Sequence, residues 1–166
     1  MEDIMQLCDV VRETGFAIHR YHKHGHLEKV YDNALAHRLR KLGLDVKQQY
    51  PLKVYDEDGT LIGDYSADLF VDNRLIIELK AAEALADEHV VQILGCLRSS
   101  RVEHGPLINF GAPKFAIKQY ALSRIAEASR PGGLIGGTLS LFVVQYPRIA
   151  QVREDFPSLR FLRYLL

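Results

Sequence analysis

The sequence predicts an α/β fold in which a central mixed β-sheet is flanked by helices. Two stretches of helical periodicity come first, and three β-rich runs separated by turn residues follow them. A third helical stretch and two short apolar runs come next. The predicted element order is therefore ααβββαββ.

Helical periodicity is present from residue 3 to about residue 21, where apolar side chains recur at steps of three and four residues. A second helix is predicted from Leu27 to Leu42, with Gly43 as its C-terminal stop. A third is predicted from Asp87 to about Ser99. These helices are expected to cover the sheet.

The predicted strands begin with a three-stranded meander over residues 46–55, 60–72 and 75–81, and two further strands follow at 106–111 and 115–122. The glycine-rich stretch 123–140 is typical of a loop or linker. We therefore expect a core domain over residues 1–121 and a C-terminal extension over 122–166, which packs on the core or is swapped from it.

Composition limits the possible functions. The chain has 166 residues, 48% of them hydrophobic, with 21 basic and 21 acidic side chains, so any nucleic-acid contact must be local. Two cysteines without zinc-ligand spacing fit a reducing cytoplasm. The N-terminus is acidic and no apolar run reaches membrane-spanning length, so we expect a soluble cytoplasmic protein that does not associate with membranes.

Charged side chains stand at the end of a very apolar run. Glu78 and Lys80 follow the apolar residues 75–77, and Asp68 lies on the preceding predicted strand. Because side chains alternate along a strand, Glu78 and Lys80 share one face and Leu79 points to the other. Burying an acid and a lysine there is costly unless they serve a purpose.

The strand register would bring the two acids together. If the turn leaves Val71 opposite Leu75, Asp68 lies opposite Glu78 with Cβ atoms about 5 Å apart. Two carboxylates this close repel each other, and a divalent cation between them removes the repulsion. Mg²⁺ suits two or three carboxylates with a phosphate substrate, so we expect Mg²⁺ here, with Mn²⁺ able to substitute.

Lys80 has two interpretations. It orients or deprotonates an attacking water and stabilises charge growing on a phosphate, or it makes a plain surface ion pair with Glu78 or Asp68. The spacing of one aspartate, one glutamate and one lysine is a loose pattern by itself. The wider sequence context is needed to decide.

Five blocks occur in one order along the chain: GHLEKVY (25–31), YSADL (65–69), IELKA (77–81), HVVQ (89–92) and LINFG (107–111). Together they resemble the GxxExxY protein family, a branch of the PD-(D/E)xK nuclease superfamily, over roughly residues 11–122. The resemblance implies a restriction-endonuclease-like core and metal-dependent hydrolysis of phosphodiester bonds.

By this resemblance, Asp68, Glu78 and Lys80 are the signature residues of the superfamily. Glu28 is its additional acidic residue and is expected to hold one or two Mg²⁺ ions together with Asp68 and Glu78. The carbonyl of Leu79 also faces the metal. Without the resemblance, Glu28 is a capping or solvated helix carboxylate. Tyr31, one turn further along, either shares the face of Glu28 or belongs to the core.

The third predicted helix carries a polar stripe formed by His89, Gln92 and Cys96. Exonuclease-like members of the superfamily have a Q-x-x-x-Y motif in this place. Gln92 matches it and is expected to position water or phosphate, whereas Cys96 replaces the tyrosine. His89 has either a functional or a structural role. The cluster of His22, His24 and His26 favours a polar turn over a metal site.

The expected protein is a metal-dependent nuclease that acts on DNA or RNA, with Glu28, Asp68, Glu78, Lys80 and Gln92 as catalytic residues. The neutral charge and Cys96 favour an alternative, a non-catalytic nucleic-acid- or protein-binding module that keeps the nuclease fold. The apolar segment from Leu141 to Leu166 favours a third, an interaction protein that dimerises or binds a partner through this segment.

Overall fold

The computed structural model describes residues 3–124 and 139–142. Its three helices within these ranges are α1 (Ile4–His22), α2 (Glu28–Lys41) and α3 (Asp87–Ser100). The strands within the same ranges are β1 (Val46–Tyr55), β2 (Leu61–Val71), β3 (Leu75–Lys80), β4 (His104–Asn109), β5 (Ala116–Arg124) and β6 (Leu139–Phe142). The predicted order of elements is confirmed, and β6 adds a strand that was not predicted.

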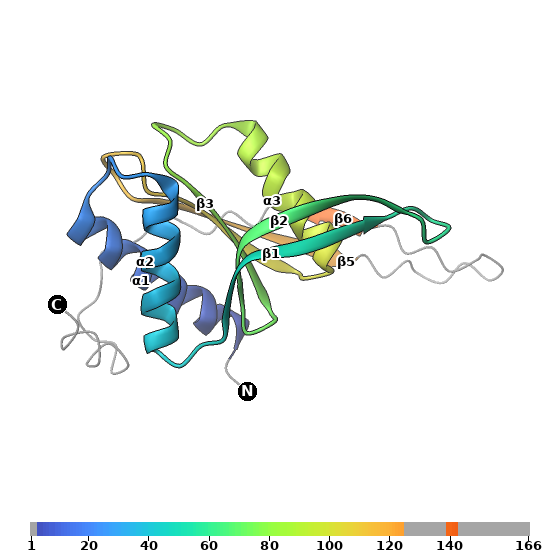
Figure 1. The fold of residues 1–166 in the computed structure, drawn as a ribbon, viewed down its shortest axis with the longest axis horizontal. Coiled ribbons are helices and arrows are strands. Elements are labelled where there is room, and N and C mark those ends of the chain that lie inside the picture. The colour runs from blue at the N-terminus through green and yellow to red at the C-terminus, as the bar shows by residue number, and fades with distance from the viewer. Residues whose placement is uncertain (1–2, 125–138, 143–166) are drawn as a thin grey trace.

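The strands form one mixed sheet in the order β1-β2-β3-β4-β5-β6. Only β3 and β4 run parallel among the described strands, and α3 connects them. All other neighbours are antiparallel. This arrangement confirms the predicted α/β fold class (Figure 1).

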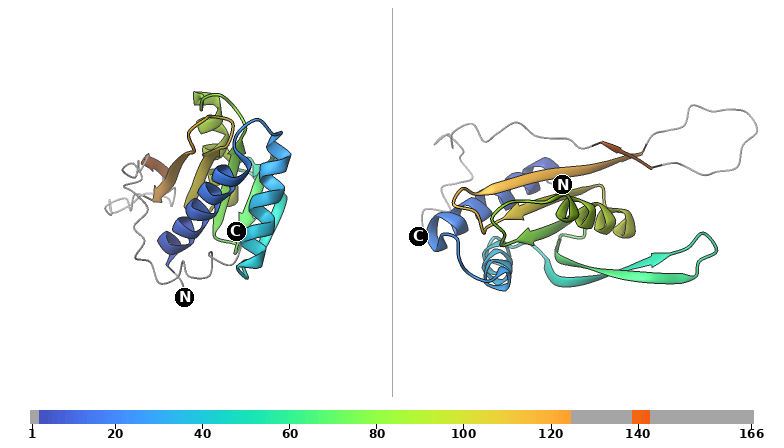
Figure 2. Two further views of the ribbon diagram at one scale, coloured as in Figure 1. Left: turned by 90° about the vertical axis from the view of Figure 1, so that its left-hand side faces the viewer. Right: turned by 90° about the horizontal axis from the view of Figure 1, so that it is seen from above.

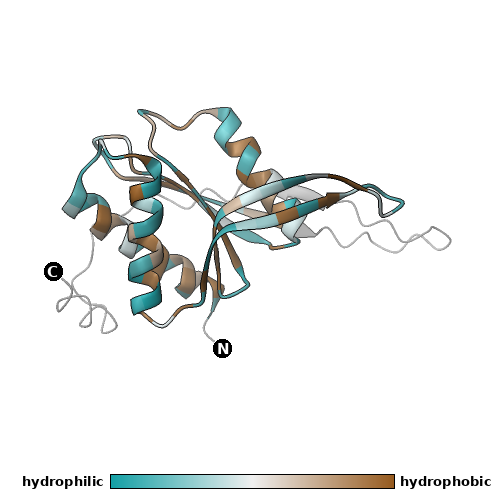
Figure 3. Ribbon diagram, viewed as in Figure 1, coloured by the Kyte–Doolittle hydropathy of each residue, from teal (hydrophilic) through white to brown (hydrophobic). Residues whose placement is uncertain are grey.

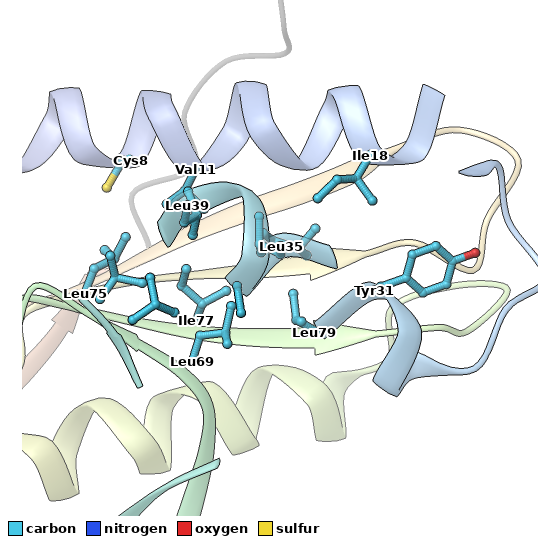
Figure 4. Close-up of a cluster of buried hydrophobic side chains, with 14 of the residues drawn as sticks. Cys8, Val11, Ile18, Tyr31, Leu35, Leu39, Leu69, Leu75, Ile77 and Leu79 are labelled. Atoms are coloured by element: carbon cyan, nitrogen blue, oxygen red, sulfur yellow. The ribbon is translucent and has the colours of Figure 1, made fainter. Parts of the chain in front are cut away.

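Helices cover both faces of the sheet. One apolar core lies between the sheet and the pair α1 and α2, and a second lies between the sheet and α3. In Figure 4 the strands pass between α1 and α3, with α2 side chains filling the space below α1. The β1–β2 hairpin extends away from this layered body (Figure 2), and its tip is hydrophilic (Figure 3).

Local signals explain where α1 begins and where α2 ends. The Asp3 side chain accepts a hydrogen bond from the Met5 N–H, and the Gln6 side chain accepts one from the Asp3 N–H, which is a capping box at the start of α1. After α2 the backbone turns at Gly43 with φ +88°, where a residue without Cβ is favoured. The predicted stop at Gly43 is confirmed.

The β2–β3 turn sets the register that positions the site. Asp72 and Asn73 have positive φ angles of 49° and 54°, a conformation that these two residue types tolerate. The turn leaves Val71 opposite Leu75, as predicted. Pairing continues to Leu69 opposite Ile77, and the next step along both strands leads to Asp68 and Glu78.

The predicted C-terminal extension lies mostly outside the described residues and stays a prediction. The structure shows that β5 continues past residue 121 to Arg124 and that β6 pairs antiparallel with it. The apolar segment from Leu141 onward falls outside the description after Phe142. Within the described ranges, none of the helices has the length and apolar character needed to cross a membrane.

Candidate active site

Asp68 is held at the place where β2 separates from β3. Its Oδ2 atom accepts a hydrogen bond from the Leu79 backbone N–H at 2.8 Å, and its Oδ1 accepts one from the Gln49 side chain at 3.2 Å. The Asp68 carboxylate thus takes the place of a backbone carbonyl of β2 as the acceptor for the Leu79 N–H of β3. Its orientation is fixed by donors from the two neighbouring strands.

Glu78 is the most buried charged group of the site, with 0% of its surface exposed. Burial, followed by the charge of Asp68, raises the pKa of its carboxyl to about 8. Two side chains of α3 stabilise it: Gln92 Nε2 donates to Oε2 at 2.9 Å, and Cys96 Sγ donates to Oε1 at 3.2 Å. The predicted pair of adjacent acids therefore exists, and α3 supports it.

Lys80 lies between two carboxylates. Its Nζ atom is 4.0 Å from Oε2 of Glu78 and 4.0 Å from Oε1 of Glu28, and its side chain is only 13% exposed. Glu28, the first residue of α2, is more exposed and makes no side-chain cap for that helix. The structure thus places Glu28 beside Lys80, and the ion pair of Lys80 with Glu78 that the alternative interpretation named is present in a mostly covered position.

Cys96 has a role that the sequence did not reveal. Burial, followed by the charge of Glu78, raises the pKa of its thiol, which keeps the thiol protonated. A protonated thiol is a weak donor, and here it points at the Glu78 carboxylate. Cys96 is therefore a hydrogen-bond partner of the buried acid.

Two other candidates have structural roles. His89 accepts a hydrogen bond from the Ala86 N–H through Nδ1 at 3.1 Å, which caps the start of α3. Tyr31 is fully buried, stacks on Phe110 with ring centroids 4.7 Å apart, and donates its hydroxyl to the Lys23 carbonyl at 2.8 Å. The core interpretation of Tyr31 is the one that the structure supports.

The exit from β3 beside Lys80 is fixed by two residues that sequence reasoning missed. The buried Asn109 accepts from the Ala82 N–H at 3.1 Å and donates to the Ala82 carbonyl at 2.8 Å. A Cβ on Gly111 would lie 2.3 Å from the Ala81 carbonyl carbon, so only glycine fits there. A polar Asn at the end of an apolar strand was the available signal.

The donor set fits a hard divalent cation. Asp68 and Glu78 supply two carboxylates, and each carboxylate oxygen has two lone-pair sites, so their bonds to the protein leave acceptor capacity. Mg²⁺ in proteins is usually held by one or two carboxylates, with water and substrate phosphate completing the shell. No group of three His, Cys, Asp or Glu side chains in residues 3–124 and 139–142 is arranged to hold a metal by itself.

The fold and the site together define a nuclease-like α/β domain, with an acid pair and a lysine at the end of a central strand. Comparison with known families agrees: a model described as the PD-(D/E)XK nuclease superfamily matches residues 5–120. The chain belongs to this superfamily. No curated protein and no solved structure matches this chain.

Proposed function

We propose that this protein is a divalent-metal-dependent nuclease of the GxxExxY branch, which hydrolyses phosphodiester bonds of nucleic acid with Mg²⁺ or Mn²⁺. The observation that carries the proposal is the buried Glu78 next to Asp68 and Lys80. A fully buried acid beside a second acid is unfavourable for folding, and a bound cation offsets this cost.

Asp68, Glu78 and the Leu79 carbonyl would hold the metal, and Glu28 would contribute from α2 through its ion pair with Lys80 rather than as a third carboxylate ligand. When bound, the metal polarises the phosphate and lowers the pKa of a coordinated water. The Leu79 N–H and Gln49 orient Asp68, while Gln92 and Cys96 orient Glu78. These donors keep both carboxylates in place while substrate enters.

Lys80 would serve the reacting groups directly. Its ammonium group lies near Glu78 and Glu28, and these two carboxyl groups keep it oriented toward the acid pair. From there it positions the attacking water and stabilises the negative charge that grows on the phosphate. Gln92 would add a polar contact to water or phosphate beside Glu78.

The test is cleavage of labelled single- and double-stranded DNA and RNA with Mg²⁺, Mn²⁺ or EDTA. Wild type is compared with Lys80→Met and Glu78→Gln, and Lys53→Met and Glu57→Gln serve as controls. The control residues are exposed and lie further along the β1–β2 hairpin. Metal-dependent cutting that only the two site substitutions abolish supports the proposal, and the cut substrate identifies DNA or RNA.

Two results would count against the proposal. Binding without cutting in any metal favours a non-catalytic module that retains the fold. Cutting that survives EDTA and both site substitutions would mean that the acids and Lys80 do not carry the reaction.

A further inference from the structure

Gln49 has a backbone conformation that is unusual inside a strand. Its φ is +49°, although it lies in the middle of β1. The pairs Gln48 with Leu69 and Tyr50 with Ala67 flank it in one continuous register, and Gln49 stands between them, across from Asp68. A left-handed conformation is unfavourable for any residue with a Cβ, so this position needs an explanation.

The backbone conformation coincides with a corner of the hairpin. In a regular strand, residues separated by an even number share a face. Val46 of β1 belongs to the core beside α1 and α2, whereas Leu52 belongs to the core beside α3. On β2, Leu69 belongs to the first core and Ala67 to the second. Both strands therefore exchange faces here, and Asp68 lies at the exchange on β2.

If the bend were the only requirement at this position, glycine would be favoured, because it adopts positive φ without strain. The side chain of Gln49 is exposed and fills no core space. Its polar atoms, however, are both engaged: Nε2 donates to Oδ1 of Asp68 at 3.2 Å, and Oε1 accepts from the Ser66 hydroxyl at 3.4 Å. The hydroxyl contact favours the orientation in which the amide nitrogen faces the carboxylate.

We infer that Gln49 is a positioning residue of the metal site, which holds the Asp68 carboxylate in the orientation that binds the cation. The inference rests on the proposed metal-dependent function. Asp68 has one oxygen fixed by the Leu79 N–H from β3 and the other by Gln49 from β1. Asp68 also shares a side-chain hydrogen bond with Glu78 of β3. Without Gln49 the carboxylate loses its donor from β1 and keeps its contacts to β3.

The adjacent Gln48 supplies a matched control. Its amide nitrogen donates to Oδ1 of Asp32 at 3.1 Å and to Oδ1 of Asn33 at 3.0 Å, and Asp32 is buried. These contacts join β1 to α2 and do not involve Asp68. Gln48 thus has the same chemistry as Gln49, on the next residue, without a contact to the proposed metal ligands.

The experiment measures Mn²⁺ affinity by isothermal titration calorimetry and thermal unfolding without metal, for wild type, Gln49→Gly, Gln49→Asn and Gln48→Ala. Glycine and asparagine both tolerate the positive φ, but glycine has no amide and the asparagine amide is one methylene shorter. We expect Gln49→Gly and Gln49→Asn to weaken Mn²⁺ binding about tenfold, as loss of a group that orients a ligand does. Their melting temperatures should stay close to that of wild type.

Gln48→Ala should show the reverse, a lower melting temperature with unchanged Mn²⁺ affinity. The inference is overturned if Gln49→Gly binds Mn²⁺ as wild type does, even when nuclease activity is established. It is also overturned if Gln48→Ala weakens Mn²⁺ binding as much as Gln49→Gly does. If wild type binds no Mn²⁺, the proposed function fails and the inference fails with it.

Discussion

The two faces of β3 differ sharply in chemistry. Toward α1 and α2 the strand presents Leu75, Ile77 and Leu79, all fully buried in one apolar core (Figure 4). On the alternate positions the strand has Ile76, which packs in the core beside α3, and then Glu78 and Lys80. One face of β3 is therefore apolar along its whole length. The other face is apolar at Ile76 and charged at Glu78 and Lys80.

This difference separates stability from function. Well-packed apolar residues in place of buried charges are often neutral or stabilising. Keeping Glu78 fully buried beside Asp68 works against folding, since burial and the second acid both disfavour its charged form. The face of β3 toward α1 and α2 therefore contributes stability, and the end of the face toward α3 carries the proposed chemistry.

The largest expected effect is on the charged face. Lys80→Met should lower the cleavage rate roughly 100- to 1,000-fold, because it removes the ammonium group that stabilises the negative charge developing on the phosphate. The side chain is mostly covered, and methionine keeps most of its apolar stem, so the protein should remain folded. Single-turnover cleavage measures the rate, and circular dichroism checks the fold. Retained activity would remove Lys80 from the mechanism.

The opposite face should respond in the opposite way. Ile77→Ala deletes apolar atoms from a fully buried position and should lower the free energy of unfolding by about 2–5 kcal/mol. Cleavage per folded molecule should be nearly unchanged, because Ile77 does not face the acids. Urea unfolding measures the free energy of unfolding, and cleavage is measured at a temperature where both proteins are folded. A large loss of activity in the folded variant would contradict the assignment of stability to one face of β3 and chemistry to the other.

The two buried cysteines sharpen the comparison, since Cys8 belongs to the core beside α1 and α2, and Cys96 to the core beside α3. Each substitution by alanine should cost about 1 kcal/mol of stability from lost packing. Only Cys96→Ala should slow cleavage, by about tenfold, because the lost hydrogen bond is to a charged group.

The same substitution should also change the pH dependence. The thiol donor lowers the pKa of Glu78, so its removal raises that pKa further. The increase in cleavage rate with pH that follows from deprotonation of Glu78 should then occur at higher pH. A pH–rate profile of Cys96→Ala and Cys8→Ala measures the shift. Identical profiles for the two variants would show that the thiol does not act through Glu78.

Much of this arrangement could be predicted from the sequence because it is local. Alternation along β3 and the short turn at Asp72 and Asn73 fix which side chains share a face and which strands face each other. These features are enough to bring Asp68, Glu78 and Lys80 together.

The remaining parts depend on contacts between distant segments. Asn109 reaches Ala82 across 27 positions, and Cys96 reaches Glu78 across 18, so no sequence period reveals either contact. The corner at Gln49 is a backbone conformation that glutamine rarely adopts. The role of Gln92 was anticipated as a contact to water or phosphate, whereas the structure shows its bond to Glu78.

The pH dependence of stability follows from the raised pKa of Glu78. Its pKa in the folded protein, about 8, lies above its ordinary value of 4.5, so between these values the folded state binds more protons than the unfolded state. The contribution of Glu78 to stability is therefore fully present below about pH 4.5 and is lost as the pH rises to about 8. Glu78→Gln should remove this fall.

The most direct test measures the free energy of unfolding of wild type and Glu78→Gln above about pH 8, without metal and with Mn²⁺. We expect Glu78→Gln to be the more stable protein without metal, and we expect Mn²⁺ to stabilise wild type much more than the variant. If Glu78→Gln is the less stable protein and Mn²⁺ stabilises both equally, Glu78 is a structural residue and the acid pair is not a metal site.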